Sequence, residues 1–250
     1  MSLRIAFDCD GCVADLDSAL EEISVRLFGE LPKPEASAEV GASPAALPDD
    51  HLVDVPAVDA AATDNSGLTE EEVQAAPARF RTLTRPQQHD LWEAVKNTEN
   101  FWETLNETEP GVIARLAQIA KERRWEVIFI TQRPSSAGDT TQLQTQRWLI
   151  AHGYELPNVY VIKGTRGKVA EALSLDVVVD DRPENCLDVK LESRARAILI
   201  WNGDIASLPP NARRLGIEPV TGIGACLDLL VSTPTAKPGL LSKLKKLVGV

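Results

Sequence analysis

Five short apolar runs along the chain predict β-strands. Each is a nearly continuous stretch of apolar residues, as expected of strands that are buried on both faces of a parallel sheet. The runs are residues 3–8, 126–131, 158–162, 176–180 and 197–201.

Apolar residues at helical spacing separate these runs. They recur every three or four positions within residues 16–27, 112–120, 148–151 and 169–173. Alternating strands and helices are typical of an open parallel sheet with right-handed crossovers. The pattern therefore predicts the α/β class, with a parallel sheet flanked by helices.

Residues 31–105 interrupt this alternation and contain no strand pattern. The first part is rich in Pro and Ala and indicates a linker over residues 32–65. The later part predicts helices, with Thr69 as an N-cap and Glu72 completing a capping box. We expect a small helical cap at residues 31–105, inserted after the first strand into a core formed by residues 1–30 and 106–232.

Residues 233–250 form a separate tail. A Thr/Pro linker precedes a basic stretch in which Leu240, Leu244 and Leu247 share one helical face. We expect a short helix that packs on its own domain or frays. Contact with an anionic membrane surface or a partner is the alternative.

The bulk composition limits the function classes. The 250 residues are 44% hydrophobic and 25% charged, as in soluble globular proteins. A net charge of -11 argues against a nucleic acid polymer as the partner but allows a small anionic substrate at a locally positive site. Four cysteines do not make a disulfide framework at this length. The sequence shows no secretory signal and no transmembrane segment, so we expect a cytoplasmic protein.

Polar residues worth noting stand at the ends of the predicted strands. Because ligands of open α/β sheets bind beyond the carboxyl ends of the strands, these residues are expected to meet in one crevice. They are Asp8 and Asp10 after the first strand, Thr131 and Gln132 at the second, Lys168 opening the helix after the third, and Asp180 and Asp181 at the fourth.

This set of side chains suits phosphoryl transfer. Crowded carboxylates repel one another, and a divalent cation such as Mg²⁺ relieves that repulsion. One carboxylate can attack phosphorus, and a second can protonate the leaving oxygen and then activate water. Thr131 and Lys168 can bind the phosphoryl oxygens, while Gly11 allows a tight turn that brings backbone amides close.

The motifs resemble those of the haloacid dehalogenase-like (HAD) phosphohydrolases. The D-x-D-G motif is present as Asp8-Cys9-Asp10-Gly11, and the other three are Thr131, Lys168 and the pair Asp180-Asp181, in order within residues 3–202. The resemblance implies a Rossmann-like core and an aspartyl-phosphate intermediate. It implies the following roles: Asp8 as nucleophile, Asp10 as general acid/base, Gly11, Thr131, Gln132 and Lys168 as phosphate-binding residues, and Asp8, Asp10 (through its carbonyl), Asp180 and Asp181 as Mg²⁺ ligands. Lys163, at a strand end, is the alternative to Lys168.

Residues 101–116 and the stretch ITQRP are similar to the 5'(3')-deoxyribonucleotidase-like branch of this superfamily. That resemblance implies a phosphomonoester hydrolase acting on a small phosphorylated metabolite, with a nucleoside monophosphate as a candidate. Two alternatives stay open, a polynucleotide-end (3'-phosphate) phosphatase and a catalytically silent binding or regulatory protein of the same fold.

Other residues have two interpretations at this stage. Arg133 and Arg182 either contact substrate or form surface salt bridges. Three cap aromatics either stack on a base or pack the cap helices; these are Trp92, Phe101 and Trp102. A zinc or redox role for the Cys9-x-x-Cys12 pair lacks a second ligand pair, because the other two cysteines stand alone in the sequence. Cys9 is therefore interpreted as the spacer between two functional carboxylates.

Overall fold

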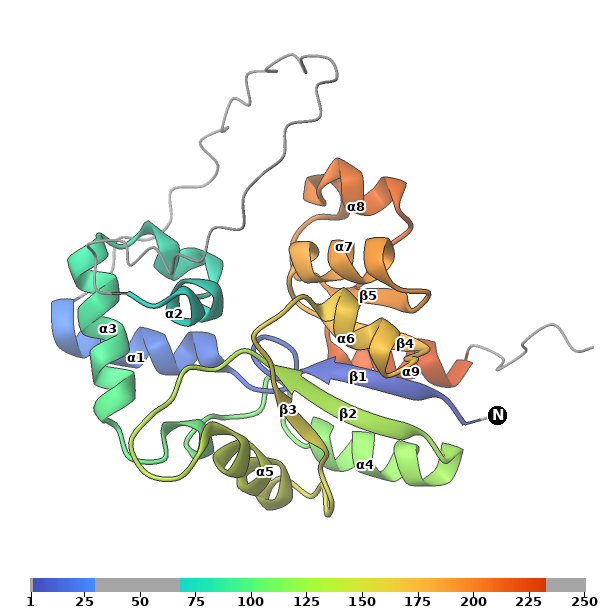
Figure 1. Ribbon diagram of the computed structural model, residues 1–250, viewed down its shortest axis with the longest axis horizontal. Helices are drawn as coiled ribbons and strands as arrows, with labels where there is room; N and C mark the ends of the chain where they lie inside the picture. Colours follow the sequence, from blue (N-terminus) through green and yellow to red (C-terminus); the bar gives the residue numbers. More distant parts are fainter. Residues whose placement is uncertain (1, 30–67, 233–250) are drawn as a thin grey trace, which may run out of the picture.

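The computed structural model describes residues 2–29 and 68–232, which form a parallel sheet covered by helices (Figure 1). The six strands run in the order β3-β2-β1-β4-β5-β6, and every adjacent pair is parallel. Their bounds are β1 (Arg4–Asp8), β2 (Glu126–Thr131), β3 (Val159–Val161), β4 (Val177–Asp180), β5 (Arg196–Ile200) and β6 (Glu218–Val220). The predicted α/β class and the open parallel sheet are confirmed.

Helices connect the strands. Their bounds are α1 (Leu16–Phe28), α2 (Glu70–Ala75), α3 (Arg85–Asn97), α4 (Val112–Arg123), α5 (Thr141–Ala151), α6 (Arg166–Ala172), α7 (Pro183–Glu192), α8 (Pro210–Arg214) and α9 (Ile223–Ser232). Short 3₁₀ turns are η1 (Ala78–Thr82), η2 (Phe101–Glu103) and η3 (Ile205–Ser207). No helix in these described parts is long and apolar enough to span a bilayer.

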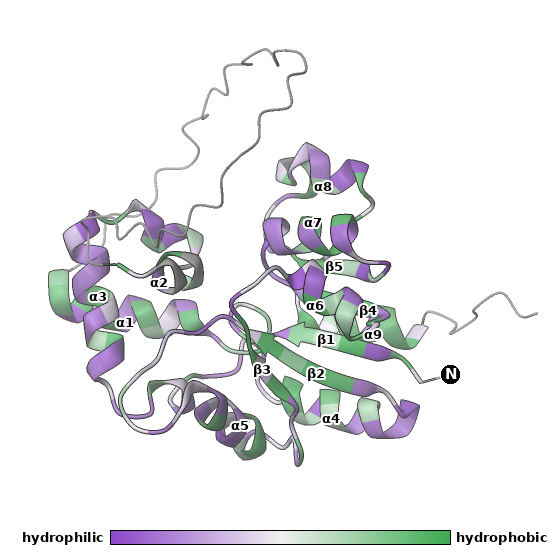
Figure 2. Cartoon of the chain, in the orientation of Figure 1, coloured by the Kyte–Doolittle hydropathy of each residue, from purple (hydrophilic) through white to green (hydrophobic). Residues whose placement is uncertain are grey.

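The two faces of the sheet pack into separate apolar clusters. Along β1, Ile5 and Phe7 face a cluster that includes residues of α4 and α9, whereas Ala6 faces one that includes residues of α6, α7 and α8. Figure 2 shows hydrophobic residues along β1 and β2 and hydrophilic ones over much of α3 and α7. Burial on both faces explains why the strands are continuous apolar runs rather than alternating ones.

The sixth strand was missed by the sequence pattern. β6 is only three residues long and contains Pro219, which cannot donate a ladder hydrogen bond. It pairs with β5 alone and forms one edge of the sheet, which is where a proline is tolerated.

Helices between residues 68 and 105 lie beside α1 at the carboxyl ends of the strands (Figure 1). The predicted capping box is confirmed, because Thr69 accepts from the Glu72 amide while the Glu72 side chain accepts from the Thr69 amide. The Lys96 ammonium pairs with the buried Glu72 carboxylate at 2.5 Å. The predicted linker at 32–65 and the tail at 233–250 lie outside the described residues.

Candidate active site

Asp8 occupies the centre of the sheet edge where the strands end. It is the last residue of β1, and β1 lies between β2 and β4. The chain order of the strands reverses here, because β2 and β3 lie on one side of β1 and β4 to β6 on the other. Such a switch point is where open α/β sheets bind ligands. The Asp8 residue is only 6% exposed.

Gly11 makes the turn after β1 possible. Its φ of +75° lies in the left-handed region that favours glycine. A Cβ at this position would lie 2.2 Å from Oδ2 of Asp181, so a larger residue would collide with a second carboxylate of the site. The Gly11 amide donates to the Ala14 carbonyl at 2.9 Å, and this bond holds the turn that separates Asp10 from the start of α1.

A buried arginine joins two of the carboxylates. Arg166 opens α6, and its guanidinium donates to Asp8 Oδ1 through Nη2 and to Asp180 Oδ2 through Nε, the latter at 3.2 Å. Its side chain is 4% exposed. Its Nη1 is buried and has no hydrogen-bond partner within residues 2–29 and 68–232. A charged donor without a partner is costly inside a protein, so this atom is suited to an anionic ligand.

The structure does not bring Lys168 to these carboxylates. Lys168 and the alternative Lys163 are both exposed, and neither lines the cavity at Asp8. Two residues along an α-helix differ by about 200° in direction. Because Arg166 points into the site, Lys168 points away from it. The basic residue against Asp8 is therefore Arg166, which sequence reasoning missed although it stands only two positions earlier in the same motif.

Asp10 forms an ion pair with Arg133. The guanidinium donates to both carboxylate oxygens, at 2.7 Å from Nη2 to Oδ1 and 2.9 Å from Nε to Oδ2. Thr131 adds a weaker bond to Oδ2 at 3.2 Å. Arg133 also donates to the Thr145 hydroxyl and lies 4.7 Å from the centre of the Trp102 ring. Arg133 is thus neither a surface ion pair nor a free substrate contact, but the residue that fixes Asp10.

The two acids at the end of β4 differ in their surroundings. Oδ1 of Asp180 accepts from the Arg182 amide at 2.9 Å and from Asn185 at 3.0 Å, in addition to the Arg166 bond on Oδ2. Oδ1 of Asp181 is buried and accepts no hydrogen bond from the part of the chain that the structure describes. Burial, and secondarily the neighbouring Asp180, raises the pKa of Asp181 to about 8. Asp180 is a structural acceptor here, whereas Asp181 has an oxygen available for a ligand.

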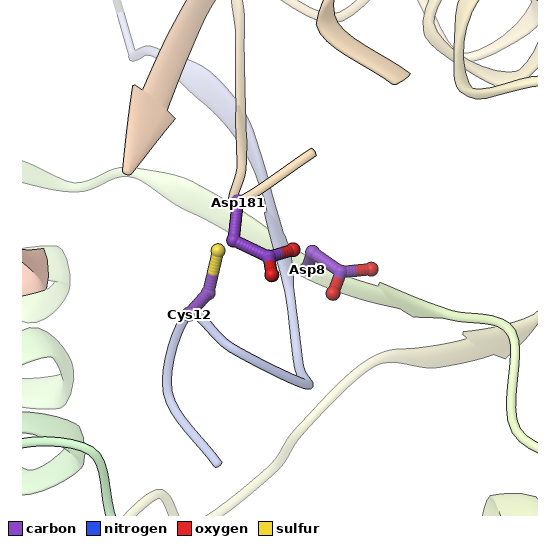
Figure 3. Close-up of side chains that lie close together, drawn as sticks. All are labelled: Asp8, Cys12 and Asp181. Carbon is purple, nitrogen blue, oxygen red and sulfur yellow. The ribbon is translucent and has the colours of Figure 1, made fainter. Parts of the chain in front are cut away.

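Asp8, Cys12 and Asp181 bring ligand atoms within 4.8 Å of one another (Figure 3). Burial raises the pKa of Asp8 well above its usual range, with Arg166 opposing the shift and Asp180 adding to it. The site holds four carboxylates, on residues 8, 10, 180 and 181, against the two buried guanidinium groups of Arg133 and Arg166. That excess of negative charge and the unpartnered Asp181 oxygen fit a hard divalent cation such as Mg²⁺. Burial raises the pKa of the Cys12 thiol well above its usual range, so the hard cation is better served by the carboxylate oxygens.

We expect the metal-free protein to lose stability through Asp181 as the pH rises. A carboxyl whose pKa is higher in the folded than in the unfolded chain binds more protons when folded, so its contribution is most favourable below about pH 4 and is lost on approaching about pH 8. In thermal unfolding at pH 5 and 8 with a chelator, the Asp181→Asn variant should gain more over the wild type at the higher pH than at the lower, by roughly a few degrees. Equal gains at both pH values would contradict a carboxyl that is neutral at the lower pH.

A small cavity of about 40 Å³ opens over Asp8. Its lining includes Asp10, Thr131, Gln132, Arg166 and Asp181, so the predicted residues of three of the four motifs meet there. Leu16 and Asp17 of α1, together with Ala75 and Pro77 of the cap side, also line it. A larger pocket of about 500 Å³ adjoins it and shares two residues with it, Gln132 and Arg182.

The remaining candidates from the sequence are structural. The cap aromatics Trp92, Phe101 and Trp102 are 2%, 3% and 0% exposed and belong to the apolar core. All four cysteines are buried and free. Asp8 and Asp10 line the small cavity over Asp8, whereas Cys9 and Cys12 do not.

No protein-family model and no curated protein matches this chain. Among solved structures, a hydrolase from Pseudomonas syringae has 11% identity and a TM-score of 0.49, covering 94% of this chain and 100% of that one. A HAD-family hydrolase from Deinococcus radiodurans R1, solved with bound phosphate and sodium, has 12% identity and a TM-score of 0.49, covering 92% of this chain and 95% of that one. The chain is thus similar to solved hydrolases, but the identities and TM-scores are too low to assign a function. The assignment of function depends on the geometry of the site.

Proposed function

We propose that this chain is a HAD-type phosphatase that hydrolyses a small phosphorylated metabolite and depends on Mg²⁺. One observation carries the proposal. Two residues beside Asp8 each keep a buried polar atom, Arg166 Nη1 and Asp181 Oδ1, that has no partner among the described residues. A phosphoryl oxygen satisfies the first, and a divalent cation satisfies the second.

The first chemical step uses Asp8 as the nucleophile. Arg166 binds Oδ1 of Asp8, so Oδ2 is the oxygen that attacks phosphorus. The new bond joins Oδ2 to phosphorus, and the bond from phosphorus to the ester oxygen breaks. Asp10 donates a proton to the leaving alcohol. The Arg166 guanidinium and the Thr131 hydroxyl stabilise charge on the phosphoryl oxygens.

The second step returns the enzyme to its starting state. Asp10 takes a proton from a water molecule, whose oxygen attacks phosphorus while the bond to Asp8 breaks, and inorganic phosphate leaves. Both oxygens of Asp10 accept bonds from Arg133, so proton transfer needs one of these bonds to open. Each oxygen accepts two bonds, Oδ1 from Nη2 and Nε of Arg133 and Oδ2 from Nε of Arg133 and the Thr131 hydroxyl, so the reacting water must displace one of these donors.

Mg²⁺, when bound, neutralises charge on the phosphoryl oxygens and on the crowded carboxylates. Asp8, Asp181 and the Asp10 carbonyl are the groups that would hold it. Asp180 would act indirectly, because its oxygens already accept from Arg166, Asn185 and the Arg182 amide. Asp180 would thereby orient the strand end that carries Asp181.

In this scheme the chain divides into a cap at residues 31–105, of which the structure describes 68–105, and a core of residues 1–30 and 106–232. Ala75 and Pro77 contribute cap atoms to the wall of the small cavity, so a closed cap excludes bulk water from the phosphoryl group. Substrate selection then lies in the adjoining pocket, which Val73 and Arg81 of the cap side also line. The tail at 233–250 has no part in this scheme, and the cytoplasmic location stays a prediction.

A nucleoside monophosphate stays a candidate substrate, but the protein offers no aromatic side chain in either pocket on which its base could stack. The chain has five Trp, two Tyr and five Phe residues, all of them within the described parts. None lines the small cavity or the larger pocket. Recognition by charge is the stronger basis for specificity in this pocket.

Turnover of an aryl phosphate with and without Mg²⁺ tests the proposal. We expect hydrolysis that EDTA abolishes and Mg²⁺ restores. Mg²⁺ should also raise the free energy of unfolding by about 2.7 kcal/mol at a hundredfold excess over the dissociation constant, and with it the unfolding temperature. The Asp181→Asn variant should lose most of that thermal shift, while Asp15→Asn, an N-cap change outside the cavity, should keep it. A metal-independent rate would remove Mg²⁺ from the scheme, and no turnover with intact Mg²⁺ binding would favour the catalytically silent alternative.

A further inference from the structure

Cys12 places a thiol among the carboxylates of the active site. The ligand atoms of Asp8, Cys12 and Asp181 all lie within 4.8 Å of one another, and Figure 3 shows the Cys12 sulfur next to Asp181. The proposed phosphatase scheme uses both carboxylates but gives the thiol no part. A sulfur ligand beside two oxygen ligands is a donor set that Mg²⁺ does not use and that softer divalent cations prefer.

The turn after β1 fixes the position of this thiol. The amides of Val13 and Ala14 both donate to the Cys9 carbonyl, at 2.9 and 2.8 Å. The Thr108 hydroxyl donates to the Cys12 carbonyl at 2.6 Å, so a segment 96 positions away holds the same turn. Cys12 is only 1% exposed. Its sulfur therefore has a fixed place beside the carboxylates.

An independent feature points to a ligand at the same place. Oδ1 of Asp181 is buried and has no hydrogen-bond partner among the described residues. A buried carboxylate oxygen without a partner is costly, and a bound cation relieves that cost. Asp8 and Asp181 line the small cavity whereas Cys12 does not, so an ion that enters through this cavity reaches the thiol past the two carboxylates.

The spacing of the three groups suits a tetrahedral ion with mixed ligands. Zinc, with bonds of about 2.0–2.3 Å to oxygen and sulfur, holds its ligand atoms roughly 3.5 Å apart. Because the three ligand atoms already lie within 4.8 Å of one another, shifts of roughly 1 Å bring them onto one ion. The bond from sulfur to the metal forms as the thiol releases its proton to solvent, and water takes the fourth position.

We infer that Asp8, Cys12 and Asp181 form a site for thiophilic divalent cations of the zinc class, and that an ion in this site inhibits the enzyme. The inhibition rests on the proposed phosphatase function, since such an ion takes up both the nucleophile and a carboxylate that would hold Mg²⁺. The two kinds of ion share Asp8 and Asp181 and therefore compete. The thiol strengthens the binding of the zinc-class ion alone, so Cys12 makes the activity depend on the ratio of the two metals.

Titration of the full chain with Cd²⁺ in thiol-free buffer tests the site without any substrate. Cd²⁺ bound to a thiolate gives an ultraviolet charge-transfer band that oxygen ligands do not give. We expect this band for the wild type, its loss in Cys12→Ser, and an affinity at least about tenfold weaker in Asp181→Asn. Cys226→Ser should keep the band as the matched control, because Cys226 is also buried and free but lies outside the cluster. A wild type without the band, or a Cys12→Ser variant that keeps it, would overturn the site.

Inhibition is measured by adding Zn²⁺ to aryl phosphate turnover at fixed Mg²⁺, with each protein compared with its own rate before Zn²⁺ is added. The Zn²⁺ concentration that halves the rate should rise at least about tenfold in Cys12→Ser and stay within about twofold of wild type in Cys226→Ser. More Mg²⁺ should relieve the inhibition of the wild type, because the two ions share carboxylates. Equal sensitivity of all three proteins would contradict inhibition through Cys12.

The two measurements separate this inference from the function on which it rests. A cadmium band that depends on Cys12, in a protein without phosphatase turnover, would refute the proposed function and the inhibition but leave the metal site. Mg²⁺-dependent turnover in a protein without that band would refute this inference and leave a phosphatase.

Discussion

Replacing Asp8 with asparagine is expected to abolish phosphatase turnover while the protein stays folded. Asparagine keeps the carbonyl oxygen that accepts from Arg166 but has no carboxylate oxygen to attack phosphorus. The pKa of Asp8 is raised chiefly by burial, so the charged carboxylate is costly in the folded protein. Removing that cost offsets part of the attraction to Arg166 that the variant loses. We expect kcat to fall at least about 10⁴-fold, as when a catalytic nucleophile is removed, and the unfolding temperature to change by less than about 5 °C.

The measurement combines steady-state rates with trapping of the covalent intermediate. A substrate labelled in its phosphoryl group should leave label on the wild-type protein after a rapid quench, and hydroxylamine should release it as it does from acyl phosphates. Asp8→Asn should retain no label. Asp15→Asn is the matched control, because asparagine and aspartate are equally good N-caps and Asp15 caps α1 only four residues beyond the site turn. Substantial turnover by Asp8→Asn would refute the assignment of Asp8 as nucleophile.

The sequence was informative about the site because parallel strands end together. Asp8, Asp10, Thr131 and Asp181 all line one cavity although up to 173 positions separate them, and each follows a run of apolar residues that could be recognised as a buried strand. The fold class followed from the same runs. Only β6, whose three residues include Pro219, carried too weak a pattern to be predicted.

The missed features depend on side-chain direction rather than on position in the chain. Arg166 and Lys168 are two residues apart at the start of α6, and only the path of the preceding loop decides which one faces β4. Arg133 was recognised as near the site, but its contact with Asp10 depends on a pocket formed by Trp102 and Thr145 from η2 and α5. No pattern within one segment contains that information, because it arises from packing between segments.

Asp180 and Asp181 show the same limit at neighbouring positions. Adjacent residues at a strand end point in different directions. Asp180 therefore accepts bonds from Asn185 and Arg166, while Asp181 turns toward Asp8 and Gly11. The acidic pair could be predicted as a site feature from the sequence, but which of the two keeps an oxygen without a partner among the described residues could not.

Replacing Arg166 with methionine is expected to have the largest effect on stability of any single change in this site. The Arg166 side chain is 4% exposed and pairs with Asp8 and Asp180, whose side chains are 7% and 0% exposed. Removing one partner of a buried ion pair leaves uncompensated charge and costs about 3–5 kcal/mol, and here two carboxylates lose the same cation. Turnover should also fall by at least about 10²-fold, because the phosphoryl group loses a preorganised donor.

Urea unfolding followed by tryptophan fluorescence measures the stability effect, and Lys168→Met is the matched control. Lys168 is exposed on the same helix, so its replacement should change the unfolding free energy by less than about 0.5 kcal/mol and leave turnover near wild type. Arg166→Lys keeps a positive charge but not the fork that reaches two carboxylates, so it should fold with intermediate stability and stay catalytically impaired. This variant keeps the test decisive if Arg166→Met does not fold. A Lys168→Met protein that loses activity while Arg166→Lys retains it would reverse the assignment and return the phosphate-binding role to Lys168.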